Sequence, residues 1–320
     1  MSKPIEDKLD KIPVINLVVR FFKQIKLPGF EGLSIYDLIE LYVRGIVKGA
    51  LTTRASAIAF SFFTAIFPFL LFVIILIPYI PIANFQTEFL DFLNSFLPPQ
   101  TSDFFFSNIF ENISGTGGAG LLSSVFLLSM LLMANGVNAV FSGFEYSFHE
   151  QLTRNAFKQY LFALGIALIL AMLVLLTVAF FGYFQIYIIE PLYQSINHEA
   201  VTETNSGVGW VIFVKYLFFV LMVYLATATL YYFGTREGRN TRFFSIGALL
   251  TTLLIILTSY LFGVYINNFS QYNELYGSIG GLLILLLYLW LNSNILLLGY
   301  ELNASLQFLK KYPKAEKEIK

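Results

Sequence analysis

Six long apolar runs, separated by shorter polar stretches, dominate the pattern of hydrophobic and polar positions along this chain of 320 residues. A run of about 20 apolar residues crosses the hydrocarbon core of a bilayer as a helix, because a helix satisfies its backbone donors and acceptors internally. The pattern therefore predicts an all-α, polytopic membrane protein with six transmembrane helices. The predicted spans cover residues 55–80, 121–142, 160–184, 209–233, 243–266 and 277–300.

The region before the first span, residues 1–54, has the pattern of amphipathic surface helices. Apolar residues recur at helical spacing through residues 34–50, after a Ser34 and Asp37 pair that is typical of a helix start. Residues 12–26 show a weaker version of the same pattern. We expect both segments to lie along the inner surface of the membrane, and packing against a soluble partner is the alternative.

The connection between the first two spans, residues 81–120, is too long for a simple turn, and loops of this length are usually structured or functional. Phenylalanines recur on one side of a predicted helix that Pro98 ends. These are Phe85, Phe89, Phe92 and Phe96. We expect a short helical external loop across the outer mouth of the bundle, acting either as a structural cover or as a lid.

Composition and charge agree with a membrane protein and orient it. Hydrophobic residues make up 57% of the chain and charged residues 12%, whereas soluble domains carry about 25% charged residues. Of the 20 Lys and Arg, 19 lie in the segments 1–54, 143–158, 234–242 and 301–320. Since cationic loops resist translocation, we expect both termini in the cytoplasm, with residues 309–320 as a basic cytoplasmic tail.

The chain offers few residues that could act in catalysis or bind a metal ion. The chain has no cysteine and two histidines, His149 and His198, which the predicted topology places on opposite sides of the membrane. They cannot share a metal ion, and no nucleophile and base stand at credible spacing, so we predict no metal, no cofactor and no enzyme activity. The segment GTGGAG at 115–120 matches a nucleotide-binding glycine pattern, but that pattern must follow a strand, and here it lies outside the membrane before a membrane span. Flexibility, or a tight entry into the second span, is the better interpretation.

Polar residues within the spans are the candidates for a substrate cavity, because they are costly in hydrocarbon and tend to face a protein interior. Asn135 and Asn138 fall along one face of the second span. Lys215, in the fourth span, is the one cation expected in the outer half of the molecule. It either snorkels to the outer headgroups, or it pairs with Glu190 or attracts an anionic headgroup into an outward-facing cavity.

Other residues are candidates for holding or gating the bundle. Arg54 begins the first span and Glu301 ends the sixth, so both are expected at the same depth. We predict a salt bridge between them that closes the bundle, either as a structural contact or as a gate. Pro68 predicts a kink in the first span. Gly277, with Gly281, permits close helix contact at the outer start of the last span.

The polar segment 266–281 is predicted to form a tight external hairpin between the fifth and sixth spans. Its tyrosines, Tyr276 among them, suit the headgroup layer, and its asparagines suit a turn. Tyr276 is also a candidate for contact with a substrate.

Two stretches, together with the six-span layout, resemble the YihY/BrkB family of bacterial inner-membrane proteins. RASAIAFSFFTAIFPFLLF at 54–72 has the Arg-Ala start and the Phe-Pro pair of that family. The stretch 265–305 has a Tyr-Gly-x-x-Gly turn and ends in LGYELNA at 298–304, where the family has Leu-Gly-Ala-Glu-Leu-Asn-Ala. The resemblance covers residues 35–308 and adds Asn303 to the structural or gating candidates. Tyr300 departs from the family's alanine.

The resemblance implies a multi-pass protein of the bacterial inner (plasma) membrane, from a family discussed in connection with lipid or lipopolysaccharide-precursor transport, serum resistance and an old ribonuclease label. Ribonuclease activity is not expected, because metal ligands and a basic groove for RNA are missing. The leading hypothesis is a transporter or flippase of an amphipathic anionic substrate such as a lipid or glycolipid. Its expected partners are membrane lipids and no nucleic acid. The alternative is a non-catalytic scaffold that docks an envelope or cytoplasmic partner, and a homo-oligomer also remains open.

Overall fold

The computed structural model describes residues 21–25, 34–36, 50–76, 119–145, 155–184, 187–188, 206–235, 237–240, 242–269 and 279–311. The predictions for the external loop, for the hairpin with Tyr276 and Gly277, for the basic tail and for most of the N-terminal region lie outside these residues.

Six long α-helices make up nearly all of the described structure. They are α4 (Ala50–Leu76), α8 (Ala119–Glu145), α9 (Ala156–Phe184), α11 (Ser206–Gly234), α12 (Ile246–Phe269) and α14 (Ile279–Lys311), with the short 3₁₀ helix η4 (Glu237–Asn240) between α11 and α12. Each of the six contains a stretch long and apolar enough to cross a membrane. The predicted all-α, six-span fold is therefore confirmed.

The helices extend past the predicted spans where polar residues follow the apolar run. α4 begins at Ala50 and not near residue 55, and α14 continues beyond residue 300 to Lys311. An apolar window measures only the part of a helix that lies in hydrocarbon, whereas Glu301 and Asn303 do not interrupt helical hydrogen bonding. The predicted spans therefore describe the apolar part of each helix, and their bounds stay predictions.

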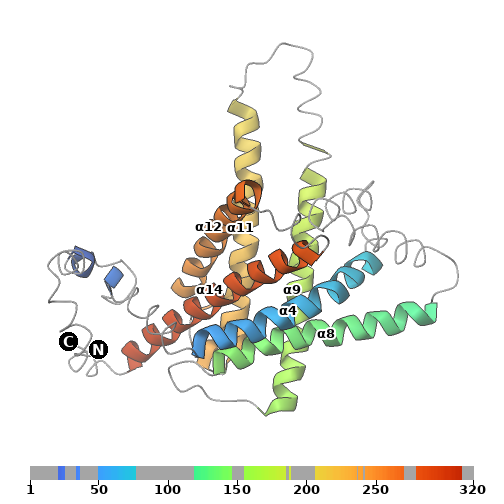
Figure 1. Ribbon diagram of the computed structural model, residues 1–320, viewed down its shortest axis with the longest axis horizontal. Coiled ribbons are helices and arrows are strands. Elements are labelled where there is room, and N and C mark those ends of the chain that lie inside the picture. Colours follow the sequence, from blue (N-terminus) through green and yellow to red (C-terminus); the bar gives the residue numbers. More distant parts are fainter. Residues whose placement is uncertain are drawn as a thin grey trace.

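The six helices contact one another in chain order, and α14 closes the ring by packing against α4. Figure 1 shows that they do not form a parallel bundle. α9 and α11 rise from a common meeting point, whereas α4, α8 and α14 leave it toward one side of the view. The helices therefore meet near one set of ends and separate toward the other.

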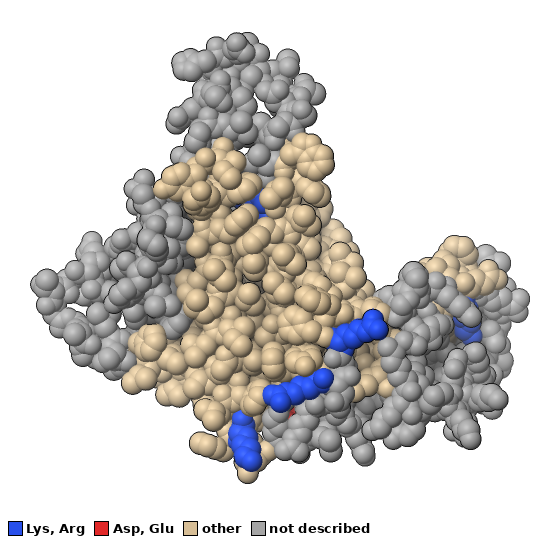
Figure 2. Space-filling model, turned by 180° about the vertical axis from the view of Figure 1, so that it is seen from behind, with Lys and Arg blue, Asp and Glu red and all other residues tan. Residues whose placement is uncertain are grey.

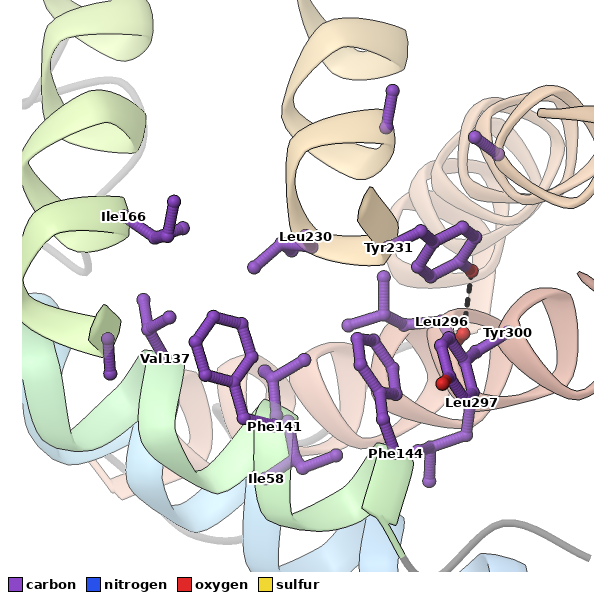
Figure 3. Packing of buried hydrophobic residues seen from close by; sticks show 14 of the residues in the cluster. Ile58, Val137, Phe141, Phe144, Ile166, Leu230, Tyr231, Leu296, Leu297 and Tyr300 are labelled. Atoms are coloured by element: carbon purple, nitrogen blue, oxygen red, sulfur yellow. Dashed lines mark hydrogen bonds between the residues drawn. The ribbon is translucent and has the colours of Figure 1, made fainter. Parts of the chain in front are cut away.

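Burial is concentrated where the helices meet, which we call the junction. The buried positions of α11 begin at Thr227, and those of α12 end at Thr252. Figure 3 shows the centre of the junction, where Phe141 and Phe144 of α8 pack against residues of α11 and α14. Away from the junction, both α11 and α12 expose large apolar side chains such as Trp210 and Tyr260. Because these helices are apolar on all sides, hydrophobic periodicity could not have identified the buried face.

Most Lys and Arg residues of the described part of the chain lie at the same end, and Lys215 of α11 is the exception. Those near or beyond the junction are Arg54, Lys158, Arg239, Arg242, Lys310 and Lys311. Figure 2 shows Lys and Arg side chains along the lower part of the described surface and one small blue area in its upper part, with a broad uncharged band between them. We call the junction side the basic end and the opposite side the splayed end.

Candidate functional site

Arg54 ties three helices together at the basic end. Its Nη2 donates to Glu301 Oε1 at 3.1 Å, and its Nη1 donates to the carbonyl oxygen of Gly143 at 2.9 Å. Gly143 lies in the last turn of α8, where carbonyl oxygens have no partner within the helix. The guanidinium therefore links α4, α8 and α14, and the predicted salt bridge is confirmed. The Arg54 side chain is only 14% exposed and that of Glu301 8%, so the pair is largely withdrawn from solvent.

Three aromatic rings fill the space beside this ion pair. Phe144 stacks on Tyr300 with ring centroids 4.1 Å apart, and it meets Tyr231 edge-on at 5.5 Å (Figure 3). The Tyr300 hydroxyl shares a hydrogen bond of 2.8 Å with Thr235 Oγ1. The ring of Tyr300, which replaces the alanine of the family motif, thereby connects α14 to both α8 and the end of α11.

Tyr231 connects α11 to α12 and α14. Its hydroxyl donates to the carbonyl oxygen of Leu296 at 2.7 Å and lies 2.6 Å from Thr251 Oγ1. Since the single tyrosine proton is used on Leu296, the Thr251 hydroxyl must be the donor in the second bond. All polar atoms of this buried pair are consequently satisfied, which is the condition under which a buried polar network stabilises a fold.

α12 and α14 cross at two glycines. A Cβ on Gly299 would collide with Thr251 Oγ1, and a Cβ on Gly247 would collide with the carbonyl oxygen of Gly299. Only glycine allows the two backbones to approach this closely, as in small-residue helix crossings generally.

Asn303 caps α12 from the neighbouring helix. Its Oδ1 accepts from the backbone N–H of Gly247 at 2.8 Å, and its Nδ2 donates to Ser245 Oγ at 2.8 Å. Ser245 Oγ also accepts from the backbone N–H of Ala248 at 3.3 Å, as a helix N-cap does. Asn303 therefore satisfies a donor at the first turn of α12 that the helix itself leaves unpaired.

The segment LGYELNA of α14 thus contacts α4, α8, α11 and α12. Gly299 meets α12, Tyr300 meets α8 and α11, Glu301 meets α4, and Asn303 meets the start of α12. Glu301 and Asn303 were candidates from the sequence, but the partners of Asn303 were not predicted. A serine near the start of the predicted span 243–266, as Ser245 is, was the available signal for the cap.

Pro68 lies within α4, and the helix continues past it to Leu76. Proline lacks the N–H that would bond to the carbonyl of residue 64. The Thr64 hydroxyl, on the same turn, donates to the carbonyl oxygen of Ser61 at 3.0 Å. Whether Pro68 bends the helix stays a prediction.

The two asparagines of α8 are not brought together with Lys215. Asn135 is exposed and Asn138 half-buried, and neither side chain forms a hydrogen bond within the described residues. Both lie on α8, whereas Lys215 lies on α11 and contacts α9. Their assignment to one substrate cavity stays a prediction.

Lys215 is seated on an aromatic cluster between α9 and α11. Its Nζ lies 5.5 Å from the ring centroid of Phe181, a cation–π distance. Phe180 and Phe218, beside it, stack at 3.7 Å. The lysine is half-buried and forms no ion pair within the part of the chain that the structure describes, and Glu190 lies outside that part. Lys215 is therefore a cation in an apolar, aromatic environment.

Metal binding finds no support in the described part of the chain. No group of three or more His, Cys, Asp or Glu side chains stands close enough there to hold an ion. His149 and His198 both lie outside the described residues.

The class of the protein follows from the six apolar helices, their all-α ring and the polar contacts that close it at one end. It is a multi-pass membrane protein. The sequence profile of the family described as Virulence factor BrkB matches residues 43–319. The chain belongs to the BrkB virulence-factor family, and the resemblance noted from the sequence is confirmed.

Relatives differ in how much of the chain they match. A ribonuclease-like protein of Bacillus subtilis, YfkH, is 25% identical over 263 residues, which is 82% of this chain and 92% of that protein. A UPF0761 membrane protein of Psychrobacter is 24% identical over 120 residues, 38% of this chain and 22% of that protein. A UPF0761 membrane protein of Xanthomonas oryzae is 39% identical over 69 residues, 22% of this chain and 16% of that protein. No solved structure matches the chain significantly.

Proposed function

We propose that this protein is a transporter or flippase that moves an amphipathic anionic substrate, such as a lipid or glycolipid, across the bacterial inner membrane. The basic end faces the cytoplasm in this proposal, because cationic segments resist translocation. Both chain termini then lie in the cytoplasm, and the splayed end faces outward.

The arrangement of the helices is the observation that carries the proposal. An ion pair, a buried aromatic cluster and a helix crossing join α4, α8, α11, α12 and α14 at the basic end, whereas α11 and α12 separate from α4 and α8 toward the splayed end (Figure 1). Alternating access requires one closed end and one end at which helices part around a substrate. Arg54 and Glu301 would then belong to the closed gate.

Lys215 supports an anionic substrate. The cation lies toward the splayed end of α11, and the rings of Phe181 and Phe218 beside it offer an apolar surface. An anionic headgroup on the ammonium, with an apolar part along the rings, would satisfy both features. A buried or half-buried cation in a membrane helix is costly and often functional, which favours this role over snorkelling.

The ribonuclease-like description of the Bacillus relative does not extend to this chain in our proposal. Metal-assisted RNA cleavage needs a cluster of ligands around an ion. The two histidines of this chain would lie on opposite sides of the membrane in the proposed orientation. We therefore propose that the protein is not an enzyme and binds no nucleic acid.

A flipping assay in proteoliposomes tests the transport proposal. A reductant added outside the vesicles destroys the fluorescent label of phosphatidylglycerol in the outer leaflet. The fraction of label that stays protected in the inner leaflet is followed over time for wild-type protein, Lys215→Gln and Lys310→Gln. Lys310→Gln is the matched control, because this substitution also removes one positive charge, at the C-terminal end of α14. We expect Lys215→Gln to slow flipping by about fivefold or more, because one lost charge contact costs about 1 kcal/mol. Lys310→Gln should behave as wild type.

Two results would contradict the proposal. One is wild-type flipping no faster than in protein-free vesicles, and the other is an unchanged rate in Lys215→Gln with a normal elution profile. If deletion of residues 1–50 abolishes function in cells while Lys215→Gln and Asn138→Ala retain it, the protein acts as a scaffold instead.

A further inference from the structure

A second group of cations lies at the basic end, away from Lys215. Lys158 stands in the first turn of α9 and Arg239 in the turn η4, and both side chains are exposed. Neither forms a hydrogen bond or an ion pair within the described residues. Two cations without acidic partners raise the local positive potential and favour a bound anion.

The position of Arg239 is set by two aromatic rings. Its guanidinium carbon lies 4.7 Å from the ring centroid of Phe162 on α9 and 5.8 Å from that of Phe233 on α11. A guanidinium that stacks on a ring uses its flat face for the contact, so its N–H donors, which lie in the plane, remain available. Such a fork matches two oxygens of a phosphate.

Lys158 lies one helical turn from the ring that Arg239 contacts. It precedes Phe162 by four residues on α9, so the two side chains occupy the same helix face one turn apart. Because Arg239 rests on Phe162, the ammonium of Lys158 and the guanidinium of Arg239 can reach one phosphate from two sides.

An exposed apolar path runs along α9 from Lys158. Leu161 is 60% and Ile169 45% exposed, and both follow the Lys158 face at helical spacing. Gly165 lies between them, and a Cβ there would meet no atom within 4 Å, which leaves a shallow gap in the path. A cation pair above an apolar path has the shape and polarity of a phospholipid.

We propose that Lys158 and Arg239 bind the phosphate of an anionic phospholipid, whose acyl chain lies along Leu161, Gly165 and Ile169. Phe181, on which Lys215 rests, is near the other end of α9, so this site is separate from the proposed substrate site. The bound lipid anchors the start of α9 to η4 whether or not the protein transports lipid.

Native mass spectrometry of the full-length protein in mild detergent tests the site. The protein is mixed with equal amounts of phosphatidylglycerol and phosphatidylcholine, and the ratio of the two adducts is measured. We expect wild type to prefer phosphatidylglycerol and the Lys158→Gln/Arg239→Gln variant to lose the preference by about fivefold for each cation removed. The control, Lys310→Gln/Lys311→Gln, removes the same charge from the end of α14 and should keep the preference.

Each other outcome overturns the assignment. An unchanged preference in the Lys158→Gln/Arg239→Gln variant, confirmed as folded by its elution profile and helical circular dichroism, would show that these cations bind no lipid. An equal loss in the control would show that net charge alone is responsible. Displacement of phosphatidylglycerol by glycerol phosphate at the same concentration would show that the site binds a phosphate group and that an acyl chain does not contribute.

Discussion

The ion pair between Arg54 and Glu301 gives the sharpest prediction about how the junction is held. We consider Arg54→Met, Glu301→Met and the double variant, which replace charged side chains by flexible apolar ones. Either single change leaves one charge largely buried without its partner, because the two side chains are only 14% and 8% exposed. Breaking a buried pair in this way costs about 3–5 kcal/mol of the free energy of unfolding.

The double variant should be more stable than the more damaged single variant. It removes both charges of the pair, and one defect that remains is the carbonyl oxygen of Gly143, which loses its bond to Arg54. An unsatisfied carbonyl costs about 1–3 kcal/mol. We therefore expect the two single effects to be non-additive, with a coupling energy of at least about 2 kcal/mol.

Thermal unfolding in detergent, followed by retention of the soluble monomer peak, measures these differences. A loss of 1 kcal/mol should lower Tm by roughly 2 °C for a chain of this size. Arg242→Met is the control, because that arginine is exposed at the same end and forms no ion pair among the described residues. Additive effects of the two single changes, or an equal shift in Arg242→Met, would refute the reasoning.

Three further predictions concern α14 and use the same thermal assay. Gly299→Ala should lower the free energy of unfolding by about 2 kcal/mol or more, because the added methyl group would collide with Thr251 and Tyr231. As a comparison, Gly165→Ala on α9 places its methyl group in open space and should be neutral or stabilising by up to about 1 kcal/mol. Tyr300→Phe should cost about 1 kcal/mol through loss of its bond to Thr235. Asn303→Ala should cost about 1–2 kcal/mol by uncapping α12. A wild-type Tm in Gly299→Ala, Tyr300→Phe or Asn303→Ala would contradict the role given to that residue.

These contacts change how the family motif is interpreted. The segment LGYELNA contains a carboxylate, an amide and a phenol, which are groups that could act on a substrate. In this structure each of them is engaged with another helix, through Arg54, Gly247 or Thr235. The motif therefore joins the helices at the basic end, and in the proposed transporter the substrate is contacted by another residue, Lys215.

Much of the fold could be predicted from the sequence, because the membrane makes simple demands on it. A segment in hydrocarbon must be helical and apolar, so six runs of sufficient length predict six helices. The pairing of Arg54 with Glu301 followed from the same logic, since two opposite charges at the same depth have few other partners. The ends of α4 and α14 did not follow from the apolar runs, because polar residues continue a helix beyond the hydrocarbon.

The candidate site depended on tertiary structure. Helices that are apolar on every side carry no periodic signal of their neighbours, so the ring order and the separation toward the splayed end could not be read from the pattern. Asn303 and Ser245 lie far apart in the chain, and only the crossing of α12 and α14 at Gly247 and Gly299 brings them into one cap. Lys215 likewise was visible as a lone cation, but its place on Phe181 follows from the packing of α9 against α11. Burial in lipid is a property of each segment, whereas contacts between helices depend on shape and on polar partners distant in sequence.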